Sequence, residues 1–160
     1  MKPIPSPKSA GPAAPLELDR FVPYRLVVLA HTVGRSIARL YERRFGLTIA
    51  EWRVMAVLGQ HGRLTANDCV DRTAMDKVRV SRAVRRLVTS GLVAREVERA
   101  DRRRAGLALS ARGRAIYDDI VPLARAEEAR LLAVLGPDER RTLDDLLARL
   151  QDQARRLDEG

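Results

Sequence analysis

Basic side chains gather in one short stretch of the sequence, between Asp76 and Arg104. This stretch holds ten lysines and arginines and four acidic residues, so it carries six of the nine net positive charges of the chain. An even background of arginine is the alternative, and the clustering argues against it. Guanidinium and ammonium groups bind phosphates and the edges of guanine bases, so the cluster predicts a polyanionic partner.

The first part of this cluster follows the repeat of a helix from about Asp76 to Ser90. Its apolar positions are Val80, Val84, Leu87 and Val88. Its basic positions are Lys77, Arg79, Arg82, Arg85 and Arg86. A basic face on an isolated helix is usually just solvated. Here a short helix and a tight connection precede it, which is the spacing of a helix-turn-helix, so the face is expected to enter a DNA major groove.

The second part of the cluster lies on the loop of a predicted β-hairpin. Strands are expected over residues 92–98 and 105–109, joined by the charged link 99–104. At the tip, Asp101 is followed by Arg102, Arg103 and Arg104. An arginine gains from the negative potential of a narrow minor groove, whereas Asp101 is expected to hold one arginine in a bidentate pair. A mobile charged turn is the alternative interpretation.

Three further helices are predicted before the basic helix and are expected to hold it in position. The sequence predicts a helix from Phe21 to Phe45 that ends at Gly46, a helix from Thr48 to near His61, and a short helix from Thr65 to about Asp71. Two of these starts carry capping-box spacing, with an acid three residues after the threonine. Two more helices are expected over 111–134 and over 138–157. Pro122 should either kink the first of them or lie where the missing hydrogen bond is tolerated.

The terminal helices have more apolar surface than one chain can cover. Segment 45–110 is expected to close a small core of its own. The helices at 21–45, 111–134 and 138–157 each carry an apolar stripe with little left to pack against, so a homodimer is predicted. A monomeric helical bundle is the alternative.

The whole chain has the composition of a globular protein of one ordinary domain. Of its 160 residues, 46% are hydrophobic and 32% charged. Five of eight prolines lie in residues 1–15, which predicts a disordered tail. The single Cys69 makes no intramolecular disulfide, and no signal peptide or membrane span is recognised, so a cytoplasmic location without membrane contact is expected.

Residues from about 21 to 157 resemble the MarR family of winged-helix regulators. The matching pieces are Gly46-Leu47-Thr48 with Glu51-Trp52-Arg53, Thr73-Ala74-Met75-Asp76-Lys77, Val80-Ser81-Arg82, Gly91-Leu92-Val93, Asp101-Arg102-Arg103-Arg104, and Leu109-Ser110 with Gly113. The chain departs from the family at Val78-Arg79, where Ser-Thr is frequent, so the family's base preference does not carry over.

The resemblance implies a mostly α fold with a small β-wing, in which terminal dimerisation helices flank a winged helix-turn-helix core. The expected division is a Pro-rich tail at 1–18, an N-terminal dimerisation helix at 19–46, the DNA-binding domain at 47–110, and C-terminal dimerisation helices at 111–160. It also implies palindromic double-stranded operators, repression of transcription, and release by a small aromatic or phenolic ligand. By position, Asp101 and Arg103 match the family's wing motif, with Arg103 as the minor-groove contact.

Two sets of candidate site residues follow from the elements and the resemblance. The candidate DNA contacts are Thr65, Asn67, Lys77, Val78, Arg79, Ser81, Arg82, Arg86, Asp101, Arg102, Arg103 and Arg104. The candidate ligand contacts are Tyr24, His31, Arg35, Trp52, Met55 and Tyr117, each of which can equally be an interface or core residue. His31 and Arg35 lie one helical turn apart and offer an anion site for an aromatic acid or its coenzyme A thioester.

Other function classes have less support in the sequence. No phosphate loop, nucleophile with its base, or metal cluster is recognised, so no catalytic residue, metal or cofactor is predicted and the chain is not expected to be an enzyme. A redox sensor of this family would carry its cysteine near the start of the first long helix, whereas Cys69 is interpreted as a small buried hydrophobe. A constitutive or architectural DNA-binding protein remains the second alternative.

Overall fold

The computed structural model describes residues 15–97 and 105–158. These residues divide into two compact units, with the boundary between Ser36 and Ile37. The described part of the first unit holds a short 3-10 helix, η1 (Leu18–Arg20), and most of α1 (Val22–Phe45). The helix η1 begins at Leu18, the last residue assigned to the tail from the sequence. Helix α1 ends where the sequence predicts, with Gly46 at a φ of 65°.

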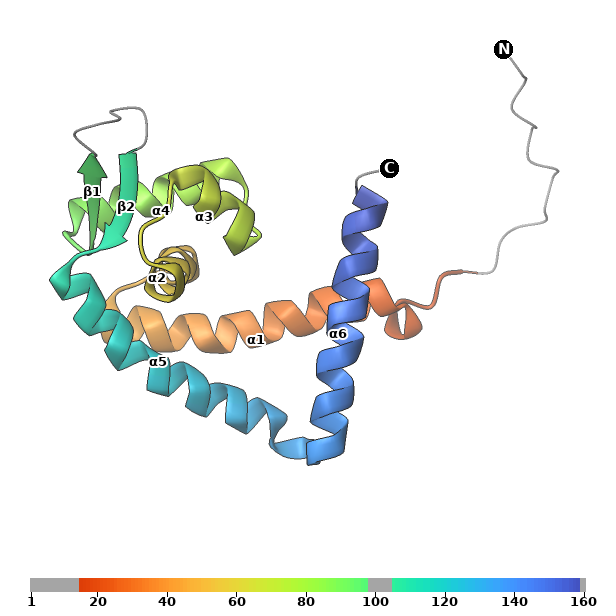
Figure 1. The fold of residues 1–160 in the computed structure, drawn as a ribbon. Coiled ribbons are helices and arrows are strands. Elements are labelled where there is room, and N and C mark those ends of the chain that lie inside the picture. Colours follow the sequence, from red (N-terminus) through yellow and green to blue (C-terminus); the bar gives the residue numbers. More distant parts are fainter. Residues whose placement is uncertain (1–14, 98–104, 159–160) are drawn as a thin grey trace, which may run out of the picture. The chain divides into compact units, whose positions relative to one another are not determined.

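The second unit contains the winged core and two long C-terminal helices (Figure 1). Its elements are α2 (Ile49–His61), α3 (Ala66–Thr73), α4 (Lys77–Thr89), β1 (Val93–Val97), β2 (Ala105–Leu109), α5 (Ala111–Leu131), η2 (Leu132–Val134) and α6 (Pro137–Asp158). This confirms the predicted fold class, mostly α with a small antiparallel sheet. Helix α3 runs two residues beyond the predicted end at Asp71, and α5 continues on both sides of Pro122.

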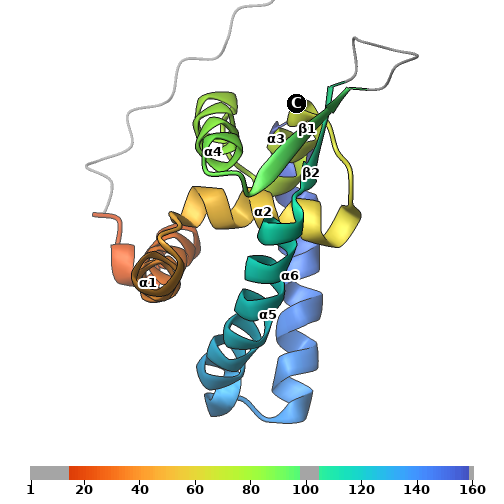
Figure 2. The ribbon, with the colours of Figure 1, turned by 90° about the vertical axis from the view of Figure 1, so that its left-hand side faces the viewer.

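Helices α3 and α4 and the hairpin pack around α2 (Figures 1 and 2). The two strands are antiparallel, with Val93 opposite Leu109 and Val97 opposite Ala105. The connection between α2 and α3 joins the hairpin through Leu64, whose N–H donates to the Leu107 carbonyl at 3.1 Å and whose carbonyl accepts from Leu107 at 2.7 Å. The base of the wing is therefore tied to the helix-turn-helix by backbone hydrogen bonds.

The hydrophobic core lies between α2, α3, α4 and the hairpin, but segment 45–110 does not close it alone. Val54, Met55 and Leu58 of α2 are fully buried, and so is Ile120 of α5. Tyr41 of α1 is 1% exposed and belongs to the same cluster. The prediction of a self-contained core was thus incomplete, because residues of both flanking helices, including the fully buried Tyr41 and Ile120, pack into it.

Both predicted capping boxes are present. The Thr48 hydroxyl accepts from the Glu51 N–H at 3.3 Å, and the Glu51 carboxylate accepts from the Thr48 N–H at 2.7 Å. The same pair of bonds joins Thr65 and Asp68, at 3.1 and 2.8 Å. Each box satisfies backbone donors that the first helical turn leaves unpaired, so α2 and α3 begin at fixed residues. In the part of the chain that the structure describes, no helix has the length and apolar character to cross a membrane.

Candidate nucleic-acid interface

Helix α4 is held by its buried face and by its first residue. Val80, Ala83, Val84 and Leu87 are at most 3% exposed and pack into the core. Asp76 caps the helix, because its carboxylate accepts the Arg79 N–H at 2.8 Å. The orientation of α4 is therefore fixed by packing, which leaves the opposite face to the solvent.

The outward face of α4 is basic, as the sequence predicts. The exposed residues of this face are Lys77, Val78, Arg79, Ser81, Arg82, Arg85 and Arg86. Val78, Ser81, Arg82 and Arg85 stand at spacings of three, four and seven residues, so they share one stripe along the helix. Val88, predicted on the apolar face, is half-buried there.

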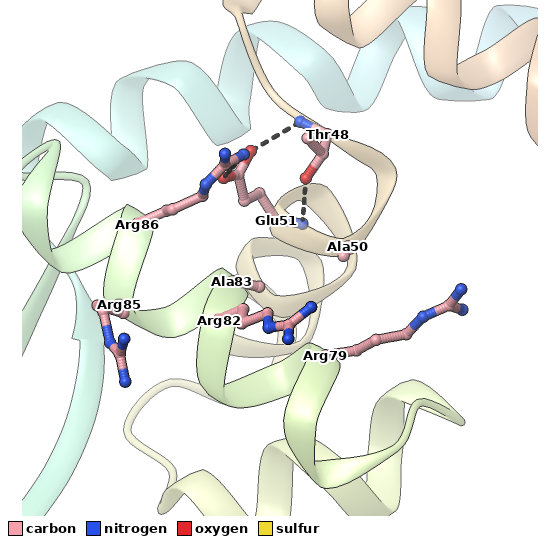
Figure 3. A pocket seen from close by; sticks show the side chains of 8 residues that line it. All are labelled: Thr48, Ala50, Glu51, Arg79, Arg82, Ala83, Arg85 and Arg86. Carbon is pink, nitrogen blue, oxygen red and sulfur yellow. Dashed lines mark hydrogen bonds and ion pairs between the residues drawn. The ribbon is translucent and has the colours of Figure 1, made fainter.

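An open cleft of about 490 Å³ lies between this face and the start of α2 (Figure 3). It is lined by Thr48, Ala50, Glu51, Arg79, Arg82, Ala83, Arg85 and Arg86. Figure 3 shows Arg86 pointing toward Thr48 and Glu51, whereas Arg85 points away from them. Four arginines of α4 line the cleft, which makes it attractive to phosphate or another anion.

The carboxylate of Glu51 links α2 to α4. Its side chain is 7% exposed, and its Oε1 lies 3.7 Å from Nη1 of Arg86, whose side chain is 71% exposed. The same carboxylate closes the capping box with Thr48. The capping box is visible in the sequence but the ion pair is not, because no local pattern joins residues that far apart in the chain.

The cations of α4 fall into two groups by their partners. Arg79 lies 3.7 Å from the Asp76 carboxylate, and Arg86 pairs with Glu51. Lys77, Arg82 and Arg85 have no ion-pair partner among the residues described in the structure. The carboxylates of the described residues therefore leave these three side chains available to phosphates or bases.

The other predicted DNA contacts are placed unevenly. Thr65 is the N-cap of α3, and its hydroxyl donates to Asp68 at 2.7 Å, so it is already engaged. Asn67 lies exposed in the first turn of the same helix. Asp101, Arg102, Arg103 and Arg104 lie outside the described residues. The structure fixes only the two strands from which that loop extends.

The predicted ligand contacts are divided between the two units. Tyr24, His31 and Arg35 lie on the part of α1 that belongs to the first unit, and all three are exposed. Met55 is fully buried in the core of the second unit, so it is a core residue, which was the alternative interpretation. The side chains of Trp52 and Tyr117 are half-buried.

Three aromatic rings join α1, α2 and α5 within the second unit. Trp52 lies between Tyr41, with ring centroids 5.0 Å apart, and Tyr117, at 5.8 Å. The guanidinium carbon of Arg114 lies 5.1 Å from the centroid of the Tyr117 ring, and Nη1 of Arg114 donates to the Gly59 carbonyl at 3.3 Å. Burial, followed by the charge of Glu127, raises the pKa of Tyr41. The position of Tyr41 in the sequence indicates only a core residue, because it follows the apolar spacing of its helix.

The lone cysteine behaves as the sequence predicts for a small apolar core residue. Cys69 is fully buried, and burial, with a smaller effect of the Asp68 charge, raises the pKa of its thiol from the ordinary 9.0 to about 11. No group of three metal-ligating side chains occurs among the described residues.

Comparison with known proteins places this geometry in a family. Residues 45–104 match the model of the MarR family. The HTH-type transcriptional regulator FarR of Neisseria gonorrhoeae is 29% identical over 104 residues, which cover 65% of this chain and 71% of FarR.

Two solved structures share the fold over most of the chain. A probable transcriptional regulator from Pseudomonas aeruginosa is 32% identical and superposes with a TM-score of 0.69, covering 84% of this chain and 99% of that one. BpsR of Bordetella bronchiseptica is 26% identical with a TM-score of 0.67, over 79% of this chain and 98% of its own; its structure concerns regulation of DNA binding by 6-hydroxynicotinic acid. The chain belongs to the MarR family of winged-helix, DNA-binding transcriptional regulators and is not an enzyme.

Proposed function

We propose that this protein is a homodimeric repressor that binds a palindromic DNA operator and is released from it by a small anionic aromatic compound. The observation that carries the proposal is the outward face of α4, where Lys77, Arg82 and Arg85 are exposed and are not paired with a carboxylate of the described chain. The opposite face is packed into the core, so these cations are presented by a rigid element.

In the proposed complex, α4 lies in the major groove and the loop Asp101–Arg104 reaches the adjacent minor groove. The DNA contacts from α4 would be Lys77, Val78, Arg79, Ser81 and Arg82, with Arg86 beside them. Asn67 and the capping residue Thr65 would lie near a phosphate at the start of α3. The wing contacts would be Asp101, Arg102, Arg103 and Arg104. The base of the wing is tied to the helix-turn-helix at Leu64, which supports a fixed distance between the two DNA-binding elements.

Exposed apolar side chains on the terminal helices support the homodimer. On α1, Leu26, Val28 and Leu29 are 41%, 45% and 56% exposed. On α6, Leu146 and Leu150 are 45% and 48% exposed. Apolar stripes of this extent are stabilised by burial against a second copy, which would also place two α4 helices on two half-sites.

For the effector, we propose a hydroxylated aromatic acid or its coenzyme A thioester. The ligand-regulated DNA binding of BpsR, a relative in sequence and fold, supports this class. His31 and Arg35, exposed and one turn apart on α1, would bind the carboxylate or the thioester-linked phosphates. Tyr24, in the first unit, is a further candidate contact. In the second unit, the candidate aromatic contacts are Trp52 and Tyr117, whose ring centroids lie 5.8 Å apart.

The experiment for DNA binding begins with in vitro selection of duplexes from a random pool by the full-length protein. The affinity for the selected duplex is then measured by fluorescence anisotropy at several salt concentrations. We expect affinity to fall steeply with salt. We also expect Arg82→Ala to weaken binding, because the variant loses an unpaired guanidinium from the outward face of α4.

Arg125→Ala is the matched control, because Arg125 is an exposed arginine of α5 outside the proposed DNA surface. It should leave the affinity and its dependence on salt unchanged. Equal decreases in affinity in the two variants, or binding that does not depend on salt, would contradict the proposed interface.

The effector is tested on the same complex with 6-hydroxynicotinate, related hydroxylated aromatic acids and their coenzyme A thioesters. We expect at least one to raise the apparent Kd for DNA, and Arg35→Ala to diminish that response without weakening DNA binding in its absence. Dissociation by an unrelated chemical class, with these compounds inactive, would contradict the proposed effector.

A further inference from the structure

The stripe of α4 that faces outward contains one apolar side chain, Val78, which is 59% exposed. Of the described residues between Leu29 and Leu131, Val78 is the only large apolar one that is exposed. Single exposed apolar residues are common on protein surfaces, so exposure alone indicates nothing. Its position indicates more, because it lies among cations on the helix that is proposed to enter the major groove.

Val78 lies near the N-terminus of α4 and at the outermost line of that helix. Asp76 is the N-cap, so Val78 is the second residue of the helix, and recognition helices contact base edges chiefly with their N-terminal residues. Arg82 follows one turn later, and the buried face of Val80, Ala83 and Leu87 is turned the other way. In the proposed complex, a side chain at this point would face the floor of the major groove.

The chemistry of valine restricts what it can contact there. Its side chain neither donates nor accepts a hydrogen bond, so it gains nothing from the polar edges of guanine, cytosine or adenine. The C5-methyl group of thymine is the apolar group that a natural base pair presents in the major groove. Valine is also β-branched and holds essentially one χ1 rotamer in a helix, so little side-chain entropy is lost when it makes that contact.

We propose that Val78 determines sequence specificity by packing against the 5-methyl group of a thymine, beside a guanine bound by Arg82. This inference rests on the proposed DNA-binding function and deepens it by naming a base. Residues four apart on a helix rise by about 6 Å, and base pairs are stacked about 3.4 Å apart. The thymine and the guanine are therefore expected within about two base pairs of each other in each half-site.

The test removes the methyl group from the DNA and the valine from the protein. In the selected duplex, each thymine of one half-site is replaced in turn by deoxyuridine, which keeps the base pair and lacks the methyl. For the wild-type protein, one such replacement should weaken binding about fourfold, the value of one buried methyl-sized group. For Val78→Ala the same replacement should have no effect, although its overall affinity is lower.

The ratio of the affinity for the thymine duplex to the affinity for the deoxyuridine duplex distinguishes a loss of base recognition from a loss of folded protein. Val78 is exposed and alanine favours helices, so Val78→Ala is expected to keep the wild-type melting temperature. Arg125→Ala serves as control and should retain the fourfold preference for thymine over deoxyuridine. The inference is overturned if Val78→Ala retains the wild-type ratio at every thymine, or if the wild-type protein shows no preference at any.

Failure of the proposed function would look different. If the selection enriched no sequence motif, specific DNA binding itself would be contradicted and the inference would fall with it. If the selection did enrich a motif, but Val78→Ala left the ratio of affinities for thymine and deoxyuridine unchanged, only the role of Val78 would be overturned.

Discussion

At the scale of single residues, Glu51 performs two structural tasks with one buried carboxylate. It completes the capping box of α2 through the Thr48 N–H and lies 3.7 Å from the guanidinium of Arg86 on α4. Because Arg86 is largely exposed, water screens this ion pair, and the pair contributes little free energy by itself. Its effect is to hold Arg86 on the α2 side of the cleft, away from the outward stripe of α4.

We therefore expect Glu51→Ala to cost more stability than Glu51→Gln. Alanine leaves the Thr48 N–H without its acceptor and should lower the free energy of unfolding by about 1 to 2 kcal/mol. Glutamine keeps an oxygen for that N–H and should cost less than about 1 kcal/mol. Chemical denaturation of the three proteins measures the difference. Equal destabilisation in both variants would show that the charge, and not the capping bond, carries the stabilisation.

A second prediction concerns Cys69 and bears on redox sensing. With a pKa of about 11, about one thiol in a thousand is ionised at pH 8, compared with about one in ten at the ordinary 9.0. Native protein should therefore react with a thiol reagent at least about 100-fold more slowly than protein in denaturant, and mild oxidants should leave DNA affinity unchanged. Rapid labelling of the folded protein, with loss of DNA binding, would support the redox alternative.

At the scale of elements, the sequence was informative wherever a signal is local. The two capping boxes, the helix ends near Gly46 and Gly62 and the paired strands all depend on residues within a few positions of one another. Contacts between distant segments could not be predicted in this way. The seal of the core by Tyr41 and Ile120 is one example, since an apolar residue at helical spacing does not reveal its partner.

The role of Gly113 also depends on a contact between distant segments, although the residue belongs to a recognisable sequence motif. The sequence pairs it with Leu109-Ser110 without giving a reason. In the structure, a side chain at Gly113 would overlap the Leu92 carbonyl, and the Ser110 hydroxyl donates to the Gly91 carbonyl at 2.7 Å. The glycine therefore allows α5 to begin directly against the turn between α4 and β1, a contact that no local pattern contains.

The turns on either side of α4 lead to two predictions of opposite sign. Ala74 ends α3 with a left-handed backbone, at a φ of 51°, and Gly91 follows α4 at a φ of 71°. A residue with a side chain costs about 1 to 2 kcal/mol in the left-handed backbone region. Glycine avoids that cost, but its greater loss of backbone entropy on folding costs about 0.5 to 1 kcal/mol relative to alanine. Ala74→Gly should raise the free energy of unfolding by up to about 1 kcal/mol, and Gly91→Ala should lower it by about 1 kcal/mol.

Thermal or chemical unfolding of these two variants checks the signs. Open space surrounds the site of an added Cβ at Gly91, so any destabilisation there comes from the backbone and not from a clash. Changes in the same direction for both variants would contradict this account of the turns.

At the scale of the whole molecule, the apolar stripe of α6 is expected to form part of the dimer interface. Leu150→Asp places a charge on that stripe and should shift the protein from dimer to monomer in sedimentation or light scattering. DNA affinity should fall strongly with it, because a monomer binds one half-site only. Ala148→Asp adds the same charge to an exposed position on the far side of α6 and should remain dimeric. A dimer that persists in Leu150→Asp would locate the interface elsewhere.

The central claim, that α4 reads DNA in the major groove, is tested most directly by methylation interference on the selected duplex. A methyl group on guanine N7 lies in the major groove and blocks an arginine there. We predict interference at guanine N7 in two stretches centred about 10 base pairs, or a multiple of that, apart, and its disappearance at one guanine per half-site with Arg82→Ala. Interference confined to adenine N3, in the minor groove, or absent altogether would contradict the claim.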